Sequence, residues 1–255
     1  MSFTLDCQTT EPAATISRSW PVPARSSAMR MKWHDLLFLN WPVEPELVQP
    51  HLPQGLELDL FDGKAWISVV PFTMSGVAPR WVPDIPWLSA FPELNVRTYV
   101  TNHDKPGVWF FTLDATNVFA VRAARALFHL NYVDAKITSV RDNNWIQYRS
   151  VRTDKNNPPA ELSVDYRPVG ESFFAVPGSL DDWLTSRYCL YVANRKGSLF
   201  RGEIEHAPWQ LRETQAVIHT NSMLDAFQIP LNGEPARMQF AKRTDVVAWT
   251  LDKID

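Results

Sequence analysis

The segment from Phe91 to Val100 alternates polar and apolar side chains along its whole length. Because successive side chains of a β-strand point to opposite faces, this pattern predicts a strand with one polar and one apolar face. The polar face carries Glu93, Asn95, Arg97 and Tyr99. Residues 87–91 and 108–113 on either side are strongly apolar, so the polar face has two interpretations. It meets water in an ordinary half-buried strand, or it lines a cavity if the sheet closes on itself, and there the four side chains would converge on a ligand.

Turn signals recur about every 8–12 residues along the rest of the chain, a spacing typical of a sandwich or a barrel. Four pairs of segments are typical of β-hairpins: 56–60 with 65–72, 94–100 with 108–115, 132–140 with 145–152, and 187–193 with 199–206. Single strands are expected at 31–41, 162–168, 211–218 and 245–251. We therefore predict one mainly β domain over residues 29–255, behind a mobile N-terminal tail of residues 1–28.

Few helices are predicted. Residues 117–130 form the main expected helix, because apolar side chains recur there at helical spacing. Short helices are expected at 44–48 and at 179–184, where Ser179 is a typical N-cap residue. Residues 77–90 are rich in proline and tryptophan and are interpreted as a long loop or lid over an opening.

The composition excludes several classes of function. The formal net charge is −3 and no run of basic residues occurs, so no nucleic-acid partner is predicted. Only nine glycines are present, and neither of the common phosphate-binding glycine motifs occurs, so no nucleotide cofactor is predicted. The eleven tryptophans and fourteen phenylalanines exceed what a core of this size needs, so some rings are expected to line a pocket or an interface.

Cysteine and histidine usage gives no sign of a disulfide or a metal site. Cys7 lies in the polar tail and Cys189 in an aromatic segment, so a disulfide between them is not expected, which fits a reducing compartment. The six histidines are scattered, and no metal is predicted. No apolar run is long enough for a membrane helix, and the first 28 residues lack the apolar centre of a signal peptide. We expect a cytoplasmic protein without a membrane partner.

Several separated motifs resemble the YqjF-like family of uncharacterised bacterial proteins. They are the run Leu36-Leu37-Phe38-Leu39-Asn40-Trp41-Pro42-Val43 after Trp33, then Phe61-Asp62-Gly63, Val69-Val70-Pro71-Phe72, Phe91-Pro92-Glu93-Leu94-Asn95-Val96-Arg97-Thr98-Tyr99, Arg187-Tyr188-Cys189-Leu190-Tyr191 and His206-Ala207-Pro208-Trp209. The resemblance covers about residues 29 to 250. It implies a fold similar to acetoacetate decarboxylase, which is a closed, cone-like antiparallel β-barrel with a ligand cavity. It does not imply a reaction, because the family has none assigned and a fold alone does not transmit function.

The resemblance also bears on individual residues. Acetoacetate decarboxylase forms a Schiff base through a lysine that follows a helix, and here Tyr132 stands at the matching position. Lys136 is the nearest substitute and shares strand parity with Tyr132, but four strand residues span roughly 13 Å. The alternative interpretation of Lys136 is a solvated lysine. Glu93 resembles the acid that the decarboxylase places on a neighbouring strand, and its alternative is a salt bridge or a structural hydrogen bond.

The remaining candidate residues each have a functional and a structural interpretation. Arg97 would anchor a carboxylate or phosphate, or would pair with Glu93 on the same strand face. Tyr99 and Tyr132 would donate hydrogen bonds or act as acids, although strand tyrosines are more often packing residues. His206 is a candidate general base, and a lone histidine is more often structural. Candidate ligand-binding residues on the strand 187–193 are Arg187 and Tyr191, which share one face with Cys189.

Three functional hypotheses remain at this point. The first is an enzyme-like barrel that binds a small organic acid or carbonyl compound, in which Arg97 holds the anion and Glu93 exchanges protons in lyase- or isomerase-like chemistry. The second is a small-molecule-binding module without catalysis. A Schiff-base, decarboxylase-like enzyme that uses Lys136 is a separate alternative to these. The third is a structural role with a filled barrel. Related barrels often assemble, so the resemblance also suggests a homo-oligomer.

Overall fold

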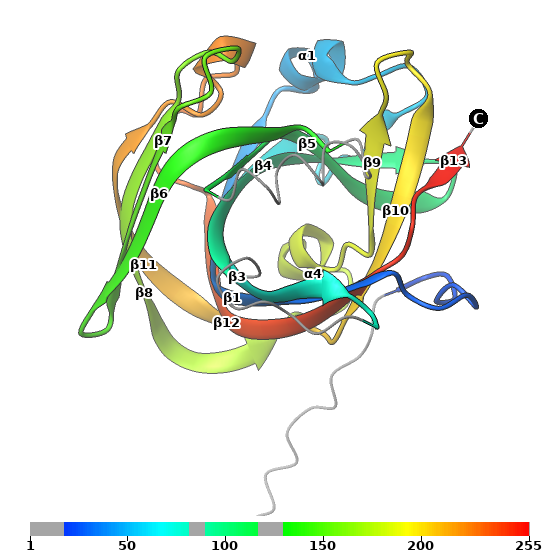
Figure 1. Ribbon diagram of the computed structural model, residues 1–255. Coiled ribbons are helices and arrows are strands. Elements are labelled where there is room, and N and C mark those ends of the chain that lie inside the picture. The colour runs from blue at the N-terminus through cyan, green and yellow to red at the C-terminus, as the bar shows by residue number, and fades with distance from the viewer. Residues whose placement is uncertain (1–17, 82–89, 117–129, 255) are drawn as a thin grey trace, which may run out of the picture.

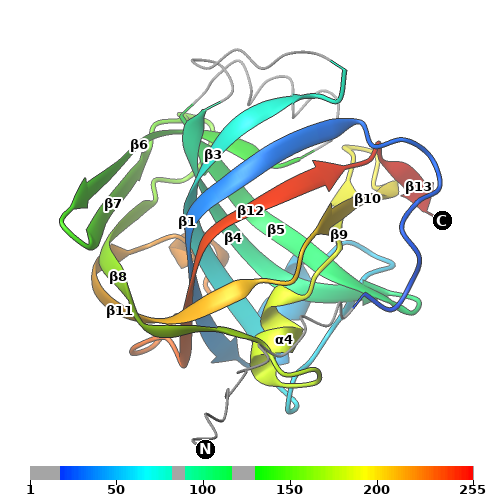
Figure 2. The ribbon, with the colours of Figure 1, turned by 90° about the horizontal axis from the view of Figure 1, so that it is seen from below.

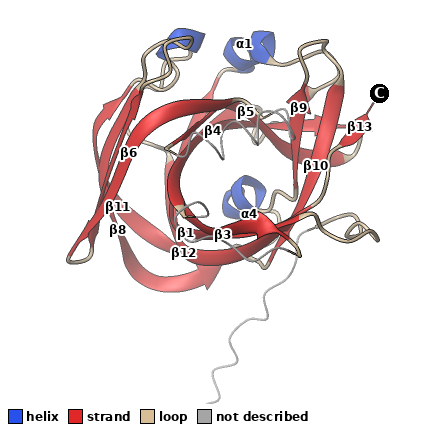
Figure 3. Ribbon diagram, in the orientation of Figure 1, coloured by secondary structure: helices blue, strands red, loops and turns tan. Residues whose placement is uncertain are grey.

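The computed structural model describes residues 18–81, 90–116 and 130–254 of the chain (Figure 1). Strands dominate the described part, and helices are few and short (Figure 3). The strands are β1 (Met29–Val43), β2 (Glu57–Leu58), β3 (Ala65–Pro79), β4 (Phe91–Asn102), β5 (Lys105–Ala115), β6 (Tyr132–Asp142), β7 (Trp145–Arg152), β8 (Glu161–Phe174), β9 (Cys189–Ala193), β10 (Leu199–His206), β11 (Gln210–Asn221), β12 (Arg237–Ala248) and β13 (Asp252–Ile254). The helices are α1 (Pro45–Val48) and α4 (Leu180–Thr185), with 3-10 turns at Gln49–His51 and Asp225–Phe227.

The strands form one sheet that curls into a cone-like ring (Figure 1). Starting at β5, the order runs β6, β7, β8, β11, β12, β1, β3 and β4, and β4 pairs again with β5. A second branch, β9 and β10, connects β5 to β12. Most pairings are antiparallel, and the exceptions are the parallel pairings of β5 with β6 and with β9. The mainly β class predicted from the turn spacing is therefore confirmed.

Helix α4 covers one end of this ring. Looking into the ring, α4 lies within the outline of the strands, and in the perpendicular view it lies at one end, beside β9 and β10 (Figures 1 and 2). Its sequence explains why it forms there. Ser179 has extended backbone angles, and its hydroxyl accepts a hydrogen bond of 3.3 Å from the backbone N–H of Asp182, as an N-cap does. The buried side chain of Leu184 packs beside Tyr99 and Val108.

Both faces of β4 are buried. The alternation of polar and apolar side chains therefore does not reflect one face turned to bulk water. Leu94 and Val96 belong to a large core cluster with side chains from β1, β3, β6, β7 and β8. The opposite face, with Phe91 and Glu93, is turned toward the branch formed by β9 and β10 and is also buried. The strand is continued by a tight turn to β5 in which His103 has a positive φ of 53°, and the two strands form the predicted hairpin.

The hairpins formed by β6 with β7 and by β9 with β10 are also confirmed. The hairpin predicted between 56–60 and 65–72 is wrong. β2 contains two residues and pairs with β4, where Leu58 lies opposite Val100. The physical reason is that β3 pairs along its length with β1 on one side and β4 on the other, so it has no free edge for β2.

Two expectations fall largely outside the described residues. The helix predicted at 117–130 lies there except for Leu130, and so does most of the loop predicted at 77–90, while β3 extends as far as Pro79. Residues 18–28 of the predicted tail are described and contact the sheet. Arg18 pairs with Glu203 and, at 2.8 Å, with Glu205. Among the described residues, no helix has the length and hydrophobicity that a membrane crossing requires.

Candidate functional site

A cavity of about 570 Å³ lies between the strands β1, β3, β4 and β5 and the branch formed by β9 and β10. Its walls come mainly from β1, β3, β4, β5, β9 and β10, with one residue each from β6, β12 and the C-terminal end of α4. Most of the lining side chains are apolar. The polar side chains of one face of β4, Glu93, Asn95, Arg97 and Tyr99, are called the β4 row, and the first three of them line the cavity. The other polar lining residues include Tyr132 at the start of β6 and Arg187 just before β9.

Glu93 is one of two acidic residues among the described lining residues, the other being Glu203, and is only 2% exposed. The Tyr132 hydroxyl donates a hydrogen bond of 2.9 Å to Glu93 Oε2. Burial raises the pKa of the Glu93 carboxyl to about 8, and the hydrogen bond from Tyr132 opposes this rise only in part. Burial, reinforced by the neighbouring Glu93, also raises the pKa of Tyr132 well above its ordinary value. At neutral pH both groups are therefore protonated and uncharged.

The backbone around Glu93 is held from the other face of β4. The hydroxyl of Tyr148, which is fully buried on β7, donates a hydrogen bond of 2.7 Å to the carbonyl oxygen of Glu93. Phe72 of β3 and Ala115 of β5 lie directly opposite Glu93 in the sheet. The carboxyl group is therefore carried by a central strand whose position is fixed on both sides.

Asn95 and Arg97 carry polar atoms that the described residues leave unsatisfied. Asn95 Oδ1 and Arg97 Nε are buried and make no hydrogen bond with a described residue. Arg97 Nη2 donates to the carbonyl oxygen of Leu184 over 3.3 Å, and the guanidinium lies over the rings of Phe38 and Tyr99 at 5.6 Å from each ring centre. Buried polar groups without partners are rare in proteins, so these atoms are natural contacts for water or a ligand.

The end of α4 positions both arginines of the cavity. Three successive carbonyl groups that end α4 accept hydrogen bonds: Trp183 from Arg187 Nε, Leu184 from Arg97 and Thr185 from Trp209 Nε1. Cations at a helix C-terminus are favoured because the last carbonyl groups carry a partial negative charge. The short helix therefore brings Arg97 and Arg187 to the same end of the cavity.

Arg187 is held more tightly than Arg97. Its Nη1 forms an ion pair with Asp59, and its guanidinium lies 4.3 Å from the ring centre of Trp183. Burial lowers the pKa of Arg187, and the charge of Asp59 opposes this effect. Arg187 Nη2 remains buried without a hydrogen-bond partner in the described part of the chain. One donor of this guanidinium is therefore free to bind a ligand.

His206 lines the cavity but lies in an apolar environment. Its ring stacks on Tyr188 at 4.8 Å and contacts Trp209, and its Nδ1 lies 2.8 Å from the carbonyl oxygen of Ala207. Burial lowers the pKa of His206 to about 4, so the imidazole is neutral at physiological pH. A neutral, buried imidazole argues against a base that titrates near neutral pH, because the charged form would have to exist without solvent.

Three other sequence candidates do not line the cavity. Tyr99 continues the β4 row, but Trp183 covers its ring at 4.6 Å and its hydroxyl lies 2.5 Å from Ser68 Oγ. Tyr191 donates to the carbonyl oxygen of Lys105 over 2.7 Å. Lys136 is exposed on β6. No lysine is among the lining residues of the described ranges, and the segments outside those ranges contain no lysine.

The sequence predicted that some aromatic rings line a pocket, because the rings are numerous, but it did not predict which ones. Trp209 is stacked on Trp33, with ring centres 6.1 Å apart, and meets Phe38 edge-on at 5.4 Å. Trp33 also contacts Phe72 at 5.7 Å. These rings come from β1, β3 and the segment between β10 and β11, so no local sequence pattern could have brought them together.

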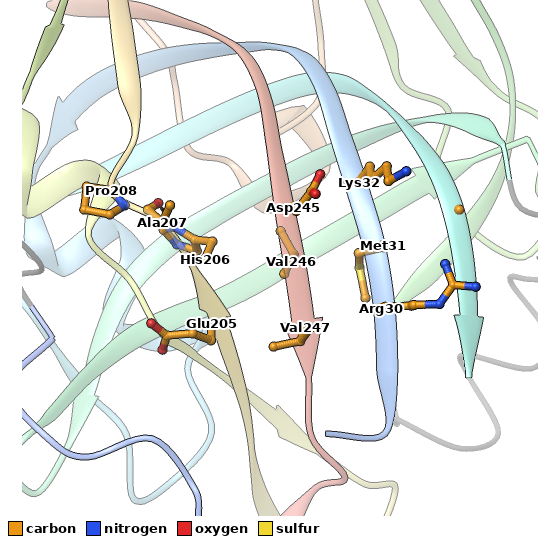
Figure 4. Close-up of a pocket in the computed structure, with 11 residues that line it drawn as sticks. Arg30, Met31, Lys32, Glu205, His206, Ala207, Pro208, Asp245, Val246 and Val247 are labelled. Carbon is orange, nitrogen blue, oxygen red and sulfur yellow. Dashed lines mark hydrogen bonds between the residues drawn. The ribbon is translucent and has the colours of Figure 1, made fainter. Parts of the chain in front are cut away.

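A groove of about 490 Å³ lies outside the cavity, along β1, β12 and β10 (Figure 4). Its charged side chains have both signs: Arg30 and Lys32 on β1, Glu205 on β10 and Asp245 on β12. Met31 and His206 line both this groove and the cavity, so they form part of the partition between them. Within the described ranges, no three histidine, cysteine or acidic side chains are grouped as metal ligands would be.

Comparison with solved structures gives the fold. Acetoacetate decarboxylase from Legionella pneumophila subsp. pneumophila str. Philadelphia 1 superposes with a TM-score of 0.61 at 12% identity, covering 94% of each chain. The enduracididine biosynthesis enzyme MppR, in a complex with pyruvate, superposes with a TM-score of 0.60 at 10% identity, covering 91% of this chain and 92% of its own. The fold is therefore acetoacetate decarboxylase-like, as the sequence motifs implied.

Comparison with known sequences gives the family. The chain is 43% identical over 232 residues to the uncharacterized protein YqjF of Bacillus subtilis (strain 168), covering 91% of this chain and 95% of YqjF. The family model DUF2071, described as "Uncharacterized conserved protein (COG2071)", matches residues 30–245. The chain therefore belongs to the DUF2071 family of uncharacterized conserved proteins.

Proposed function

We propose that the protein binds a small organic acid or carbonyl compound in its cavity and exchanges a proton with it through Glu93. The observation that supports this most directly is the row of Glu93, Asn95 and Arg97 on one cavity-facing side of β4. A protonated carboxyl, an amide and a guanidinium there face the same internal space. Each offers a different polar contact to one molecule.

The cations favour an anionic ligand. Arg97 forms no ion pair with a described residue, and Arg97 Nε and Arg187 Nη2 are buried donors that no described residue accepts from. A planar guanidinium recognises a carboxylate by paired hydrogen bonds, and such charge-assisted bonds gain strength where water is excluded. A carboxylate at this end of the cavity would satisfy both donors and neutralise the charge of Arg97.

The protonation state of Glu93 favours proton transfer. An acid with a pKa of about 8 remains protonated at pH 7 and still lies close enough to that pH to release its proton. It would donate to a carbonyl or hydroxyl oxygen of the ligand and take a proton back as the carboxylate. Tyr132 fixes the carboxyl through Oε2 during this exchange. The reaction class is enolisation or dehydration next to a carbonyl group.

Schiff-base chemistry is not part of this proposal. A Schiff base requires a lysine amine at the ligand, and the cavity has no lysine. Lys136, the substitute suggested by the sequence motifs, is exposed to solvent. Tyr132, which stands where acetoacetate decarboxylase has its Schiff-base lysine, instead donates a hydrogen bond to Glu93.

A second candidate is binding without catalysis, which the stacked rings of Trp33 and Trp209 favour because they offer a large apolar contact surface. The two candidates share the anion anchor and differ in whether Glu93 exchanges a proton. Deuterium exchange in D₂O at C3 of a bound 2-oxo acid, the carbon next to the carbonyl group, separates them when it is followed by NMR. Catalysed exchange that is lost in Glu93→Gln supports the enzyme, and binding without exchange supports the binding module.

Thermal shift with a panel of organic acids and carbonyl compounds tests the binding itself. A ligand at about a hundred times its Kd stabilises the folded state by roughly 2.7 kcal/mol. The response should disappear in Arg97→Ala and persist in Arg243→Ala, because Arg243 is 52% exposed and lies outside the cavity. Equal responses in the two variants would contradict an anchor at Arg97.

A further inference from the structure

We infer that the ligand of this cavity is a monocarboxylate with a large apolar body, such as a medium-chain or aryl-substituted oxo acid, and not a three- or four-carbon acid. This inference rests on the proposed function and adds the substrate class. It follows from the volume of the cavity, the chemistry of its walls and the placement of its charges.

The volume is too large for the smallest oxo acids. At roughly 30 Å³ per non-hydrogen atom, the share of one water in the liquid, a cavity of about 570 Å³ holds about nineteen such atoms. A three-carbon oxo acid has about six, so it would leave most of the space to water. The cavity falls within the range of roughly 300–1,000 Å³ that suits ligands several times larger.

The walls away from Glu93, Asn95 and Arg97 are mostly apolar. They include Met29 and Met31 on β1, Met74 and Val77 on β3, and Trp249 after β12. Water in contact with such walls finds few hydrogen-bond partners, whereas a hydrocarbon body gains from their contact. Methionine side chains are flexible and adapt to irregular shapes, which favours a variable chain over one rigid small group.

Two of the cavity tryptophans present their apolar faces only. Trp209 Nε1 is bonded to the carbonyl oxygen of Thr185 at 2.9 Å, and Trp249 Nε1 to that of Arg25 at 2.7 Å. Trp33 Nε1 has no partner among the described residues, so it leaves one donor in this part of the wall. The indole rings therefore act mainly as hydrophobic surface.

The charged side chains of the cavity suit a ligand with a single carboxylate. Arg97 and Arg187 are the only cations among the described lining residues, and both are held at the end of α4. The other charged lining residue, Glu203, is an anion whose carboxylate is bound by Arg18 and by Trp20 Nε1, the latter at 2.7 Å. A second carboxylate further into the cavity would meet no other cation of the described residues, which disfavours dicarboxylates.

A chain-length series tests this inference on the unmodified protein. Isothermal titration with pyruvate, 2-oxobutanoate, 2-oxohexanoate and 2-oxooctanoate should show affinity rising about two- to fourfold for each added methylene. The dicarboxylate 2-oxoglutarate should bind at least tenfold more weakly than 2-oxohexanoate. 1-Octanol should bind more weakly than octanoate, because it lacks the group that Arg97 and Arg187 would hold.

A pair of valine variants locates the apolar body. Val77→Phe adds a ring to the cavity wall, whereas Val217→Phe adds the same ring on β11 at a side chain that is 49% exposed and outside the cavity. Val77→Phe should reduce the affinity for 2-oxooctanoate at least fivefold and leave that for 2-oxobutanoate unchanged. Val217→Phe should leave both unchanged.

The outcomes separate this inference from the proposed function. Affinities that stay flat or fall with chain length, while pyruvate binding still depends on Arg97, would overturn the inference and leave the proposed function standing. Binding of no acid of any length would overturn both. Binding of 1-octanol as tight as that of octanoate would overturn the carboxylate requirement in both.

Discussion

The Tyr132 hydroxyl donates a hydrogen bond of 2.9 Å to Glu93 Oε2, and neither group has a charge at neutral pH. The pair joins β4 to β6, which are not neighbours in the sheet, on the side of the sheet that faces the cavity. Glu93 thus keeps its proton in an apolar cavity while one of its oxygens is fixed. This arrangement underlies the proposed acid chemistry and the predictions below.

Replacing Tyr132 by Phe should raise the pKa of Glu93 further. The hydrogen bond from Tyr132 lowers the pKa of Glu93, and its loss leaves burial unopposed. A hydrogen bond contributes about 1 kcal/mol, which corresponds to a shift of about half to one pKa unit. A ¹³C NMR titration of the labelled glutamate carboxyls measures it. A downward shift in Tyr132→Phe would contradict the account, and Tyr166→Phe is a matched control because Tyr166 bonds to Asp35 and not to Glu93.

The stability of the folded protein should decrease from about pH 5 to pH 8 through Glu93. Its pKa is raised from 4.5 to about 8 on folding, so in this window the folded state holds a proton that the unfolded state has released. The contribution is present in full below the unfolded pKa and is lost as the pH rises through the folded value. The loss should be about 4 kcal/mol over this window, at about 1.4 kcal/mol per pH unit.

Urea unfolding of the wild type and Glu93→Gln at several pH values isolates this contribution. The amide cannot ionise and keeps an oxygen for the Tyr132 hydroxyl, so the stability of the variant should depend less on pH. Glu161→Gln, at an exposed position, is the matched control and should follow the wild type. Parallel profiles for the wild type and Glu93→Gln would show that Glu93 does not hold a proton in this range.

His206 should contribute in the opposite direction at lower pH. Its pKa is lowered from 6.5 to about 4, so between these values the unfolded state binds a proton that the folded state does not. The stability from this burial is present above about pH 6.5 and is lost as the pH falls through about 4, by about 3 kcal/mol in total. ¹⁵N NMR of the imidazole at pH 5 should show the neutral ring. A midpoint near 6.5 would restore His206 as a candidate base.

The buried ion pair between Arg152 and Asp114 should be the most sensitive charged pair for stability. Arg152 Nε and Nη2 bind the two carboxylate oxygens of Asp114 at 3.0 and 2.9 Å, and the side chains are 2% and 0% exposed. Arg152→Met leaves a buried carboxylate without its partner and should cost about 3–5 kcal/mol in urea unfolding.

An exposed pair supplies the control for this measurement. Arg149→Met removes an ion pair of 2.8 Å with Asp165 whose arginine is 38% exposed, and it should cost less than about 1 kcal/mol. Similar losses of unfolding free energy in Arg149→Met and Arg152→Met would contradict the claim that burial makes the Arg152–Asp114 pair the more sensitive one. The double variant Arg152→Met/Asp114→Leu should recover part of the loss, because no unpaired charge remains.

The local pattern of β4 could be predicted from the sequence, but the extent of its polar row could not. Alternation places Glu93, Asn95, Arg97 and Tyr99 on one face, and the first three line the cavity. Tyr99 does not, because Trp183 of α4 packs on its ring. That contact joins residues far apart in sequence, and no spacing rule predicts where α4 docks on the ring.

Long-range contacts also explain the other differences. Arg187 lies at the cavity because the end of α4 and Asp59, 128 residues away, hold its guanidinium. His206 differs from an ordinary histidine because Tyr188 and Trp209 exclude water from it. The pairing of β2 with β4 depends on both edges of β3 being occupied. Sequence periodicity describes single elements, whereas these features depend on which elements meet.

A crystal structure with 2-oxooctanoate bound tests the central claim most directly. The account predicts that the ligand lies in the cavity, with its carboxylate within hydrogen-bond distance of Arg97 Nε and Arg187 Nη2. Its carbonyl oxygen should lie near the Glu93 carboxyl, and its chain should lie along the methionine and tryptophan walls. A carboxylate bound elsewhere, or a cavity that holds only water at a ligand concentration far above the measured Kd, would contradict the account.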